Sequence, residues 1–102
     1  MMRTALVVGV TLFPFLVGAS LPIVGAGQSV YAEKKCSLCH EIDGKGGKFG
    51  GDLSHVGSKR EGAWLKRFMR DPMTLKPAAK MKPFTGTNDE LEALVAYLRS
   101  LK

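Results

Sequence analysis

The chain has 102 residues, which gives room for one small domain. Its 15 Lys and Arg residues outnumber its nine Asp and Glu residues, and the formal net charge of +6 favours acidic partners. The basic residues are scattered along the chain, so nucleic acid is not the expected partner. Both cysteines lie in one short motif, which excludes a long-range disulfide framework. The one aromatic-basic cluster consists of Trp64, Lys66, Arg67, Phe68 and Arg70.

Residues 1–26 have the composition of a secretory signal peptide. A single charge, Arg3, precedes an apolar run over residues 5–17. Pro22 is expected to break the helix that this run would form, and the small residues that follow suit cleavage after Ala26. We therefore predict an exported protein.

Two alternatives to this cleavage site remain. A second possible cut follows Ala32, although it would remove a stretch to which we assign a folding role. The segment could instead stay uncleaved as a membrane anchor, because residues 5–24 would extend roughly 30 Å as a helix. With cleavage after Ala26 or with an uncleaved anchor, residues 27–102 form the domain. It lies in the periplasm or another exported location, in contact with the membrane if the segment is uncleaved.

Three helices are predicted in this domain, which makes it all-α. Residues 27–35 form the first helix and lead directly into Cys36. Residues 61–70 form a middle helix with its apolar side chains on one face, and it ends before Pro72. The last helix follows a capping box of Thr87 and Glu90. Its apolar residues recur at helical spacing and are Leu91, Leu94, Val95, Leu98 and Leu101.

Long loops connect these helices. Residues 42–51 contain five glycines, a density that is incompatible with a regular helix or a packed strand. Residues 73–87 contain two prolines and show no sustained periodicity, and no β-hairpin signal is recognised in the chain. Loops of this length in a small compact domain indicate that a ligand fills the interior.

The motif Cys36-Ser37-Leu38-Cys39-His40 has the pattern of covalent haem attachment. Two thiols at this spacing reach the two vinyl groups of one haem c, and the adjacent imidazole binds the iron. The other ring nitrogen of His40 needs a carbonyl acceptor, which we expect from the backbone of Gly50 or Gly51. A thioredoxin-type site would need a βαβ context, and a zinc site would need a second ligand pair, for which only His55 remains.

Met81 is the expected second axial ligand of the iron. It lies in a proline-flanked loop that is long enough to reach the far side of the haem, and a Met/His pair raises the reduction potential. Met73 is its main competitor, whereas Met69 is assigned to core packing on the middle helix. His55 would instead give a bis-histidine site, but a lone loop histidine is usually only solvated.

Five further motifs accompany the haem motif: Gly27-x-x-Val30-Tyr31, Gly51-Asp52-Leu53, Trp64-Leu65 with Asp71-Pro72, Met81-x-Pro83-Phe84, and Leu94-Val95-Ala96-Tyr97-Leu98. Together they resemble class I cytochromes c over essentially the whole mature chain. The resemblance implies a cytochrome c-like fold around one haem, whose edge is exposed. It also implies that the first and last helices cross at Gly27, with close approach by Leu94 and Tyr97.

The resemblance implies that Gly51, Leu53 and Trp64 belong to the haem-binding residues. The Trp64 indole would donate to a haem propionate, with core filling as the alternative. Many relatives have proline where this chain has Gly51. The carbonyl that accepts from His40 is retained, but the rigidity of the proline is lost.

These patterns predict a single-electron carrier with His40 and Met81 as axial ligands, and not an enzyme. Two alternatives are a ligand-binding haem protein, such as a gas sensor or peroxidase, and the haem subunit of a membrane redox complex. The expected partners are redox proteins with acidic surfaces. The lysines expected to meet them are Lys34, Lys45, Lys48, Lys80 and Lys82.

Overall fold

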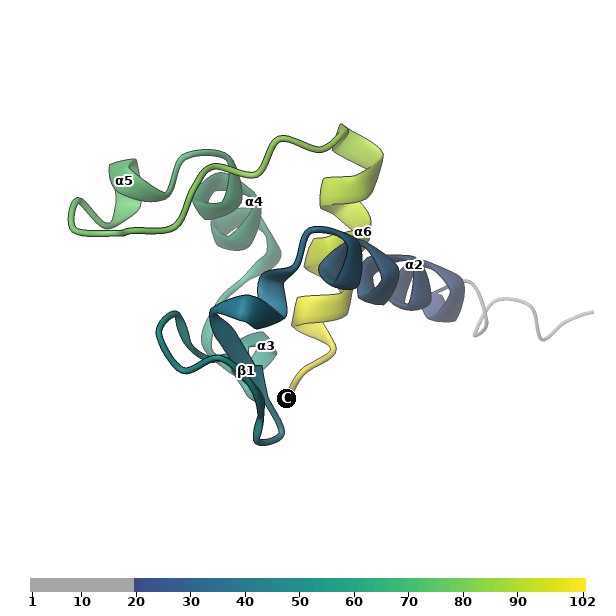
Figure 1. The fold of residues 1–102 in the computed structure, drawn as a ribbon. Helices are drawn as coiled ribbons and strands as arrows, with labels where there is room; N and C mark the ends of the chain where they lie inside the picture. Colours follow the sequence, from purple (N-terminus) through teal and green to yellow (C-terminus); the bar gives the residue numbers. More distant parts are fainter. Residues whose placement is uncertain (1–19) are drawn as a thin grey trace, which may run out of the picture.

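The computed structural model describes residues 20–102 (Figure 1). In this part of the chain no helix is both long enough and apolar enough to cross a membrane. The elements are α2 (Ser20–Glu33), the 3-10 helix η1 (Cys36–Leu38), β1 (His40–Ile42), β2 (Lys45–Gly46), β3 (Gly51–Asp52), α3 (Val56–Lys59), α4 (Gly62–Arg70), α5 (Pro72–Leu75) and α6 (Asn88–Arg99).

Helices α2 and α6 cross each other and form the centre of the fold (Figure 1). The crossing point is Gly27, where an added Cβ atom would lie 1.9 Å from the carbonyl oxygen of Ala93 and 2.7 Å from the Cβ atom of Tyr97. The predicted crossing at Gly27 is therefore confirmed, although Ala93 rather than Leu94 makes the closest backbone contact. Tyr31 packs edge-on against Tyr97, with the ring centroids 5.6 Å apart.

Helix α2 begins at Ser20, seven residues before the predicted start at residue 27. The expectation that Pro22 breaks the helix of the apolar run concerns residues 5–17, which lie outside the described residues, whereas Pro22 itself lies within α2. Pro22 lies in the first turn of α2, where a backbone N–H has no acceptor within the helix, so its missing N–H carries no penalty. The predicted cleavage site after Ala26 consequently lies inside α2. The rest of the predicted signal peptide, residues 1–19, lies outside the described residues.

Helices α4 and α6 form where the sequence predicts them. Helix α4 buries Leu65 and Met69, which confirms the packing role assigned to Met69. Helix α6 begins with the predicted capping box, in which Glu90 N donates to Thr87 Oγ1 and Thr87 N donates to Glu90 Oε1. The buried core residues are Val30, Tyr31, Leu65, Met69, Phe84, Leu91, Ala93, Leu94, Val95 and Leu98.

A small three-stranded sheet adds to the predicted helical fold and corrects the expectation of loop alone at residues 42–51. Strand β1 lies in the middle, antiparallel to β2 and parallel to β3. The β1–β2 hairpin turns through Asp43 and Gly44, whose φ values are 52° and 81°. Positive φ at both central residues is typical of a type I′ turn, and Asp-Gly is a preferred sequence for it. The hairpin signal was therefore present and was missed, because the dense glycines were interpreted as loop.

Two short helices also correct the prediction of three helices. Helix α5 overlaps the start of the segment predicted as loop. It begins at Pro72, which suits the first helical position because it lacks an N–H. Helix α3 lies against the end of the chain, where Gly57 N donates to the carbonyl oxygen of Leu101 at 2.7 Å. The described part of the chain therefore has five α-helices and one 3-10 helix.

Candidate functional site

The Cys-x-x-Cys-His motif begins where α2 ends. Lys35 adopts the left-handed conformation, with φ 58°, and turns the chain out of α2 into η1. Cys39 N then donates to the carbonyl oxygen of Cys36 at 3.2 Å, which closes the turn between the cysteines. The two cysteines do not form a disulfide with each other. Cys36 is half-buried, and burial raises the pKa of its thiol, whereas Cys39 is exposed.

His40 follows the turn as the first residue of β1. Its Nδ1 atom lies 3.2 Å from the carbonyl oxygen of Gly51, the neighbouring residue across the parallel β1–β3 pair. Because a carbonyl oxygen only accepts, Nδ1 must carry the ring proton in this hydrogen bond. The Nε2 atom of the neutral ring is then unprotonated, which is the form that binds a metal.

The glycine loop packs against the backbone of the motif. Gly47 N donates to Ser37 O at 2.9 Å, and Gly50 N donates to Cys39 O at 2.5 Å. A Cβ atom on Gly47 would lie 2.1 Å from the carbonyl oxygen of Leu38, and one on Gly50 would lie 2.9 Å from His40 Cε1. The absence of side chains at these glycines therefore lets the loop lie directly against the motif.

Other predicted site residues converge on one hydrophobic cluster. Cys36, Leu53, Trp64 and Met81 are all partly buried against the core formed by α2, α4, α6 and Phe84. Leu53 is also fixed by its backbone N–H, which donates to the carbonyl oxygen of Glu41 at 2.7 Å. Segments that are distant in the sequence thus bring a thiol, a thioether and an indole to one apolar region.

The two candidate methionine ligands differ in their surroundings. Met81 is half-buried and packs against the core cluster, whereas Met73 on α5 is 60% exposed. His55 is exposed at the N-terminus of α3, and its side chain makes no capping hydrogen bond there. Of the three candidate ligands, Met81 is therefore the one that packs against the core cluster, and its role as a ligand stays a prediction.

Trp64 lies between an arginine and a phenylalanine. Its ring stacks on Phe68 with centroids 4.9 Å apart, and the Arg60 guanidinium lies 4.0 Å from the Trp64 ring centroid. The stack places a cation beside the aromatic ring at the edge of the core cluster. The propionate contact expected of Trp64 stays a prediction.

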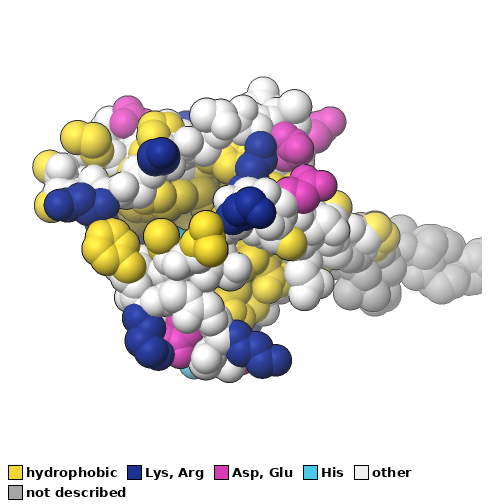
Figure 2. Space-filling model, in the orientation of Figure 1, with side chains coloured by type: hydrophobic (Ala, Val, Ile, Leu, Met, Phe, Trp, Pro, Cys, Tyr) yellow, Lys and Arg dark blue, Asp and Glu magenta, His cyan; other side chains and the backbone are white. Residues whose placement is uncertain are grey.

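The residues around the motif fit an apolar macrocycle with covalent attachment. Leu38, which lies between the two cysteines, and Phe49, which lies in the glycine loop, are 72% and 78% exposed. In Figure 2, hydrophobic side chains gather between the hairpin and the segment that carries α5, with basic side chains around them. Tyr31 presents a buried hydroxyl that has no hydrogen-bond partner among the described residues.

Two residues with a role near this site were not assigned one from the sequence. Tyr31 was recognised only as part of the Gly27-x-x-Val30-Tyr31 motif, yet it belongs to the buried cluster against which Cys36 packs. Arg70 was recognised only as part of a basic cluster, yet its guanidinium donates to the segment that follows Met81. A buried tyrosine or an arginine at a helix end carries no local pattern that reveals such contacts.

Comparisons with known proteins agree with this arrangement. The model of the family "Cytochrome c" matches residues 24–102 of this chain. The chain is also 33% identical over 89 residues to the cytochrome c oxidase subunit 2 of Alkalihalophilus pseudofirmus. That alignment covers 78% of this chain but only 26% of the relative, so the chain spans about a quarter of the length of the curated relative.

Proposed function

Because the chain belongs to the cytochrome c family, we propose that it is a single-electron carrier with one covalently bound haem c. Cys36 and Cys39 would form the thioether bonds, and His40 and Met81 would be the axial ligands. When bound, haem c supplies an iron that alternates between the ferric and ferrous states. The proposal depends above all on the hydrogen bond from His40 Nδ1 to Gly51 O, which leaves Nε2 free to bind a metal.

The protein's own residues would keep the iron six-coordinate. His40 is oriented by the β1–β3 pair, and Met81 packs against the core cluster. With both axial positions filled by side chains of a packed domain, little rearrangement accompanies a change of oxidation state. An electron carrier benefits from this rigidity, whereas a gas sensor or a peroxidase needs an open position.

The optical spectrum of the oxidised holoprotein tests the ligand assignment. We expect a methionine-sulfur-to-iron charge-transfer band in the wild type and in Met73→Ala, and its loss in Met81→Ala. Met73→Ala is the matched control because Met73 is the competing ligand and its side chain is exposed. If the band survives in Met81→Ala, Met73 is the ligand instead. If the wild type lacks the band, neither methionine binds the iron.

We propose that this carrier works outside the cytoplasm and docks with acidic redox proteins. Support comes from the signal-like composition of the N-terminal segment and from the net charge of +6. Intact-mass measurement tests the first point, because cleavage after Ala26 leaves residues 27–102 plus one haem. The five candidate docking lysines are Lys34, Lys45, Lys48, Lys80 and Lys82, all of them exposed.

Salt dependence tests the docking proposal. The rate of electron transfer to an acidic redox protein should fall as ionic strength rises, and Lys80→Gln and Lys82→Gln should lower it at low salt. Lys66→Gln is the matched control, because Lys66 already pairs with Glu92 on α6 at 2.6 Å. A rate that does not change with salt would contradict electrostatic docking.

A second candidate function is the haem-containing part of a membrane redox complex. The similarity to a cytochrome c oxidase subunit 2 supports it, as does the extension of α2 back to Ser20 through the predicted cleavage site. Purification from membranes with the N-terminal segment retained would favour this candidate. Recovery of a protein of the cleaved mass from the soluble exported fraction would favour the free carrier.

A further inference from the structure

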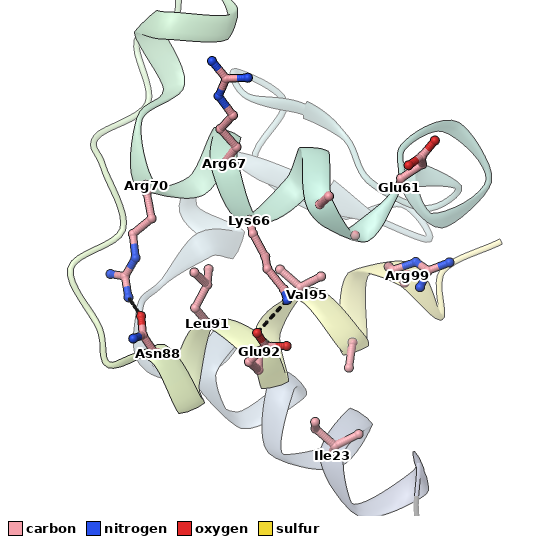
Figure 3. A pocket seen from close by; sticks show the side chains of 13 residues that line it. Ile23, Glu61, Lys66, Arg67, Arg70, Asn88, Leu91, Glu92, Val95 and Arg99 are labelled. Carbon is pink, nitrogen blue, oxygen red and sulfur yellow. Dashed lines mark hydrogen bonds and ion pairs between the residues drawn. The ribbon is translucent and has the colours of Figure 1, made fainter.

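Arg70, the last residue of α4, makes a forked contact with the segment that joins Met81 to α6. Its Nη1 atom donates to the carbonyl oxygens of Phe84 and Gly86, at 3.1 and 2.8 Å. Its Nη2 atom donates to Asn88 Oδ1 at 2.8 Å. Figure 3 shows the Arg70 side chain extending from α4 to Asn88 at the start of α6. One half-buried guanidinium therefore bridges three positions of the chain downstream of Met81.

This segment has few other attachments. Residues 79–85 form no regular secondary structure. Within the described chain, the hydrogen bonds that tie residues 80–86 to other segments are Phe84 N to Met69 O, at 2.7 Å, and the two from Arg70. The Phe84 ring is buried, and the Arg70 guanidinium lies 5.5 Å from its centroid. Arg70 thus contributes most of the polar anchoring three to five residues beyond Met81.

We propose that Arg70 is a positioning residue that holds the Met81 segment closed over the haem. The inference rests on the proposed ligation by Met81. A small ligand that binds the ferric iron must first displace Met81, and its apparent affinity falls with the free energy needed to open the segment. Weakening the Arg70 anchor should therefore raise the affinity of the protein for such a ligand.

Lys66 provides a matched control on the same helix. It lies one turn before Arg70 and also reaches across to α6, where it pairs with Glu92 (Figure 3). It makes none of the contacts with the segment that follows Met81. Loss of Lys66 loosens the α4–α6 contact without releasing that segment, which separates local positioning from general destabilisation.

The experiment is an optical titration of the ferric holoprotein with imidazole. In Arg70→Gln we expect the imidazole affinity to rise about tenfold or more, because two to three charge-assisted hydrogen bonds are lost. Arg70→Lys keeps the charge but loses the forked contact, so its imidazole affinity should also rise clearly. Asn88→Ala removes one of the acceptors of Arg70, and its imidazole affinity should rise by about two- to threefold. The imidazole affinity of Lys66→Gln should equal that of the wild type.

A second readout is hydrogen exchange at the Phe84 amide. It should accelerate in both Arg70 variants and remain unchanged in Lys66→Gln. If Arg70→Gln does not yield folded holoprotein, Arg70→Lys and Asn88→Ala carry the test.

Several results would overturn the inference. One is an imidazole affinity in the folded Arg70 variants that equals that of the wild type. Another is a rise in the imidazole affinity of Lys66→Gln as large as that of the Arg70 variants. A rise in Arg70→Gln with none in Arg70→Lys would assign the effect to charge alone and would also overturn it. A wild type that lacks the methionine-to-iron band overturns the proposed function instead, which keeps the two failures distinguishable.

Discussion

The ring of His40 donates from Nδ1 to the carbonyl oxygen of Gly51 across 3.2 Å, and Gly51 makes this contact with a φ of +95°. Proline is fixed near −65° and cannot adopt that conformation. The glycine is therefore more than a flexible replacement for the proline that the resemblance implies at this position. The backbone here takes a path that favours glycine and still presents its carbonyl to the histidine.

This relationship predicts the result of substituting Gly51. An added Cβ atom would meet nothing within 4 Å, so Gly51→Ala should cost only the strain of a positive φ, about 1–2 kcal/mol. Gly47→Ala should cost more, on the order of 3 kcal/mol, because its Cβ atom would lie 2.1 Å from the carbonyl oxygen of Leu38. Urea unfolding of the two variants measures the difference. Equal losses of stability would contradict the proposed packing of the glycine loop.

The crossing of α2 and α6 depends on the missing side chain of Gly27. Gly27→Ala places a Cβ atom 1.9 Å from the carbonyl oxygen of Ala93, so the helices must separate. We expect a loss of roughly 3 kcal/mol in the free energy of unfolding. Gln28→Ala, at an exposed neighbouring position, should change stability by no more than about 0.5 kcal/mol. The crossing contact would be disproved if the two variants unfolded alike.

The capping box determines where α6 begins. Thr87→Ala removes the acceptor for Glu90 N and should lower the free energy of unfolding by about 1 kcal/mol. Thr85→Ala removes the same kind of side chain from an exposed position outside the helix and should have little effect. Thermal unfolding of the two variants compares them directly. A Tm for Thr87→Ala no lower than that for Thr85→Ala would contradict a stabilising cap.

Tyr31 should make stability fall at high pH. Burial raises the pKa of its phenol from 10.0 to about 12, so the unfolded chain releases this proton first as the pH rises. The contribution of Tyr31 is fully present below pH 10 and is lost between pH 10 and pH 12. Tyr31→Phe should therefore lose less stability than the wild type over that interval, measured by unfolding at pH 8, 10 and 11. Parallel pH profiles would show that the phenol does not titrate as its burial requires.

Sequence patterns predicted the parts of this molecule that depend on local chemistry. Helix α6 follows from the Thr87–Glu90 box and the leucine spacing, and the middle helix follows from its single apolar face. The expected carbonyl partner for His40 also appears, because the glycine segment is short enough to return beside the motif.

Contacts between distant segments were not predictable in the same way. The three acceptors of Arg70 lie 14, 16 and 18 residues further along the chain, and no local pattern links them to it. The start of α2 was missed because an apolar segment before Gly27 resembles a leader as much as a helix. The hairpin at Asp43-Gly44 is different, since its signal was local and the surrounding glycines obscured it.

If His40 and Met81 are both axial ligands, the iron has no open position. Addition of carbon monoxide to the reduced holoprotein at neutral pH tests it most directly. The wild-type spectrum should remain unchanged, and Met81→Ala should form the carbon monoxide complex readily. Ready formation of that complex by the wild type would contradict an electron carrier with two protein ligands and would identify a ligand-binding haem protein instead.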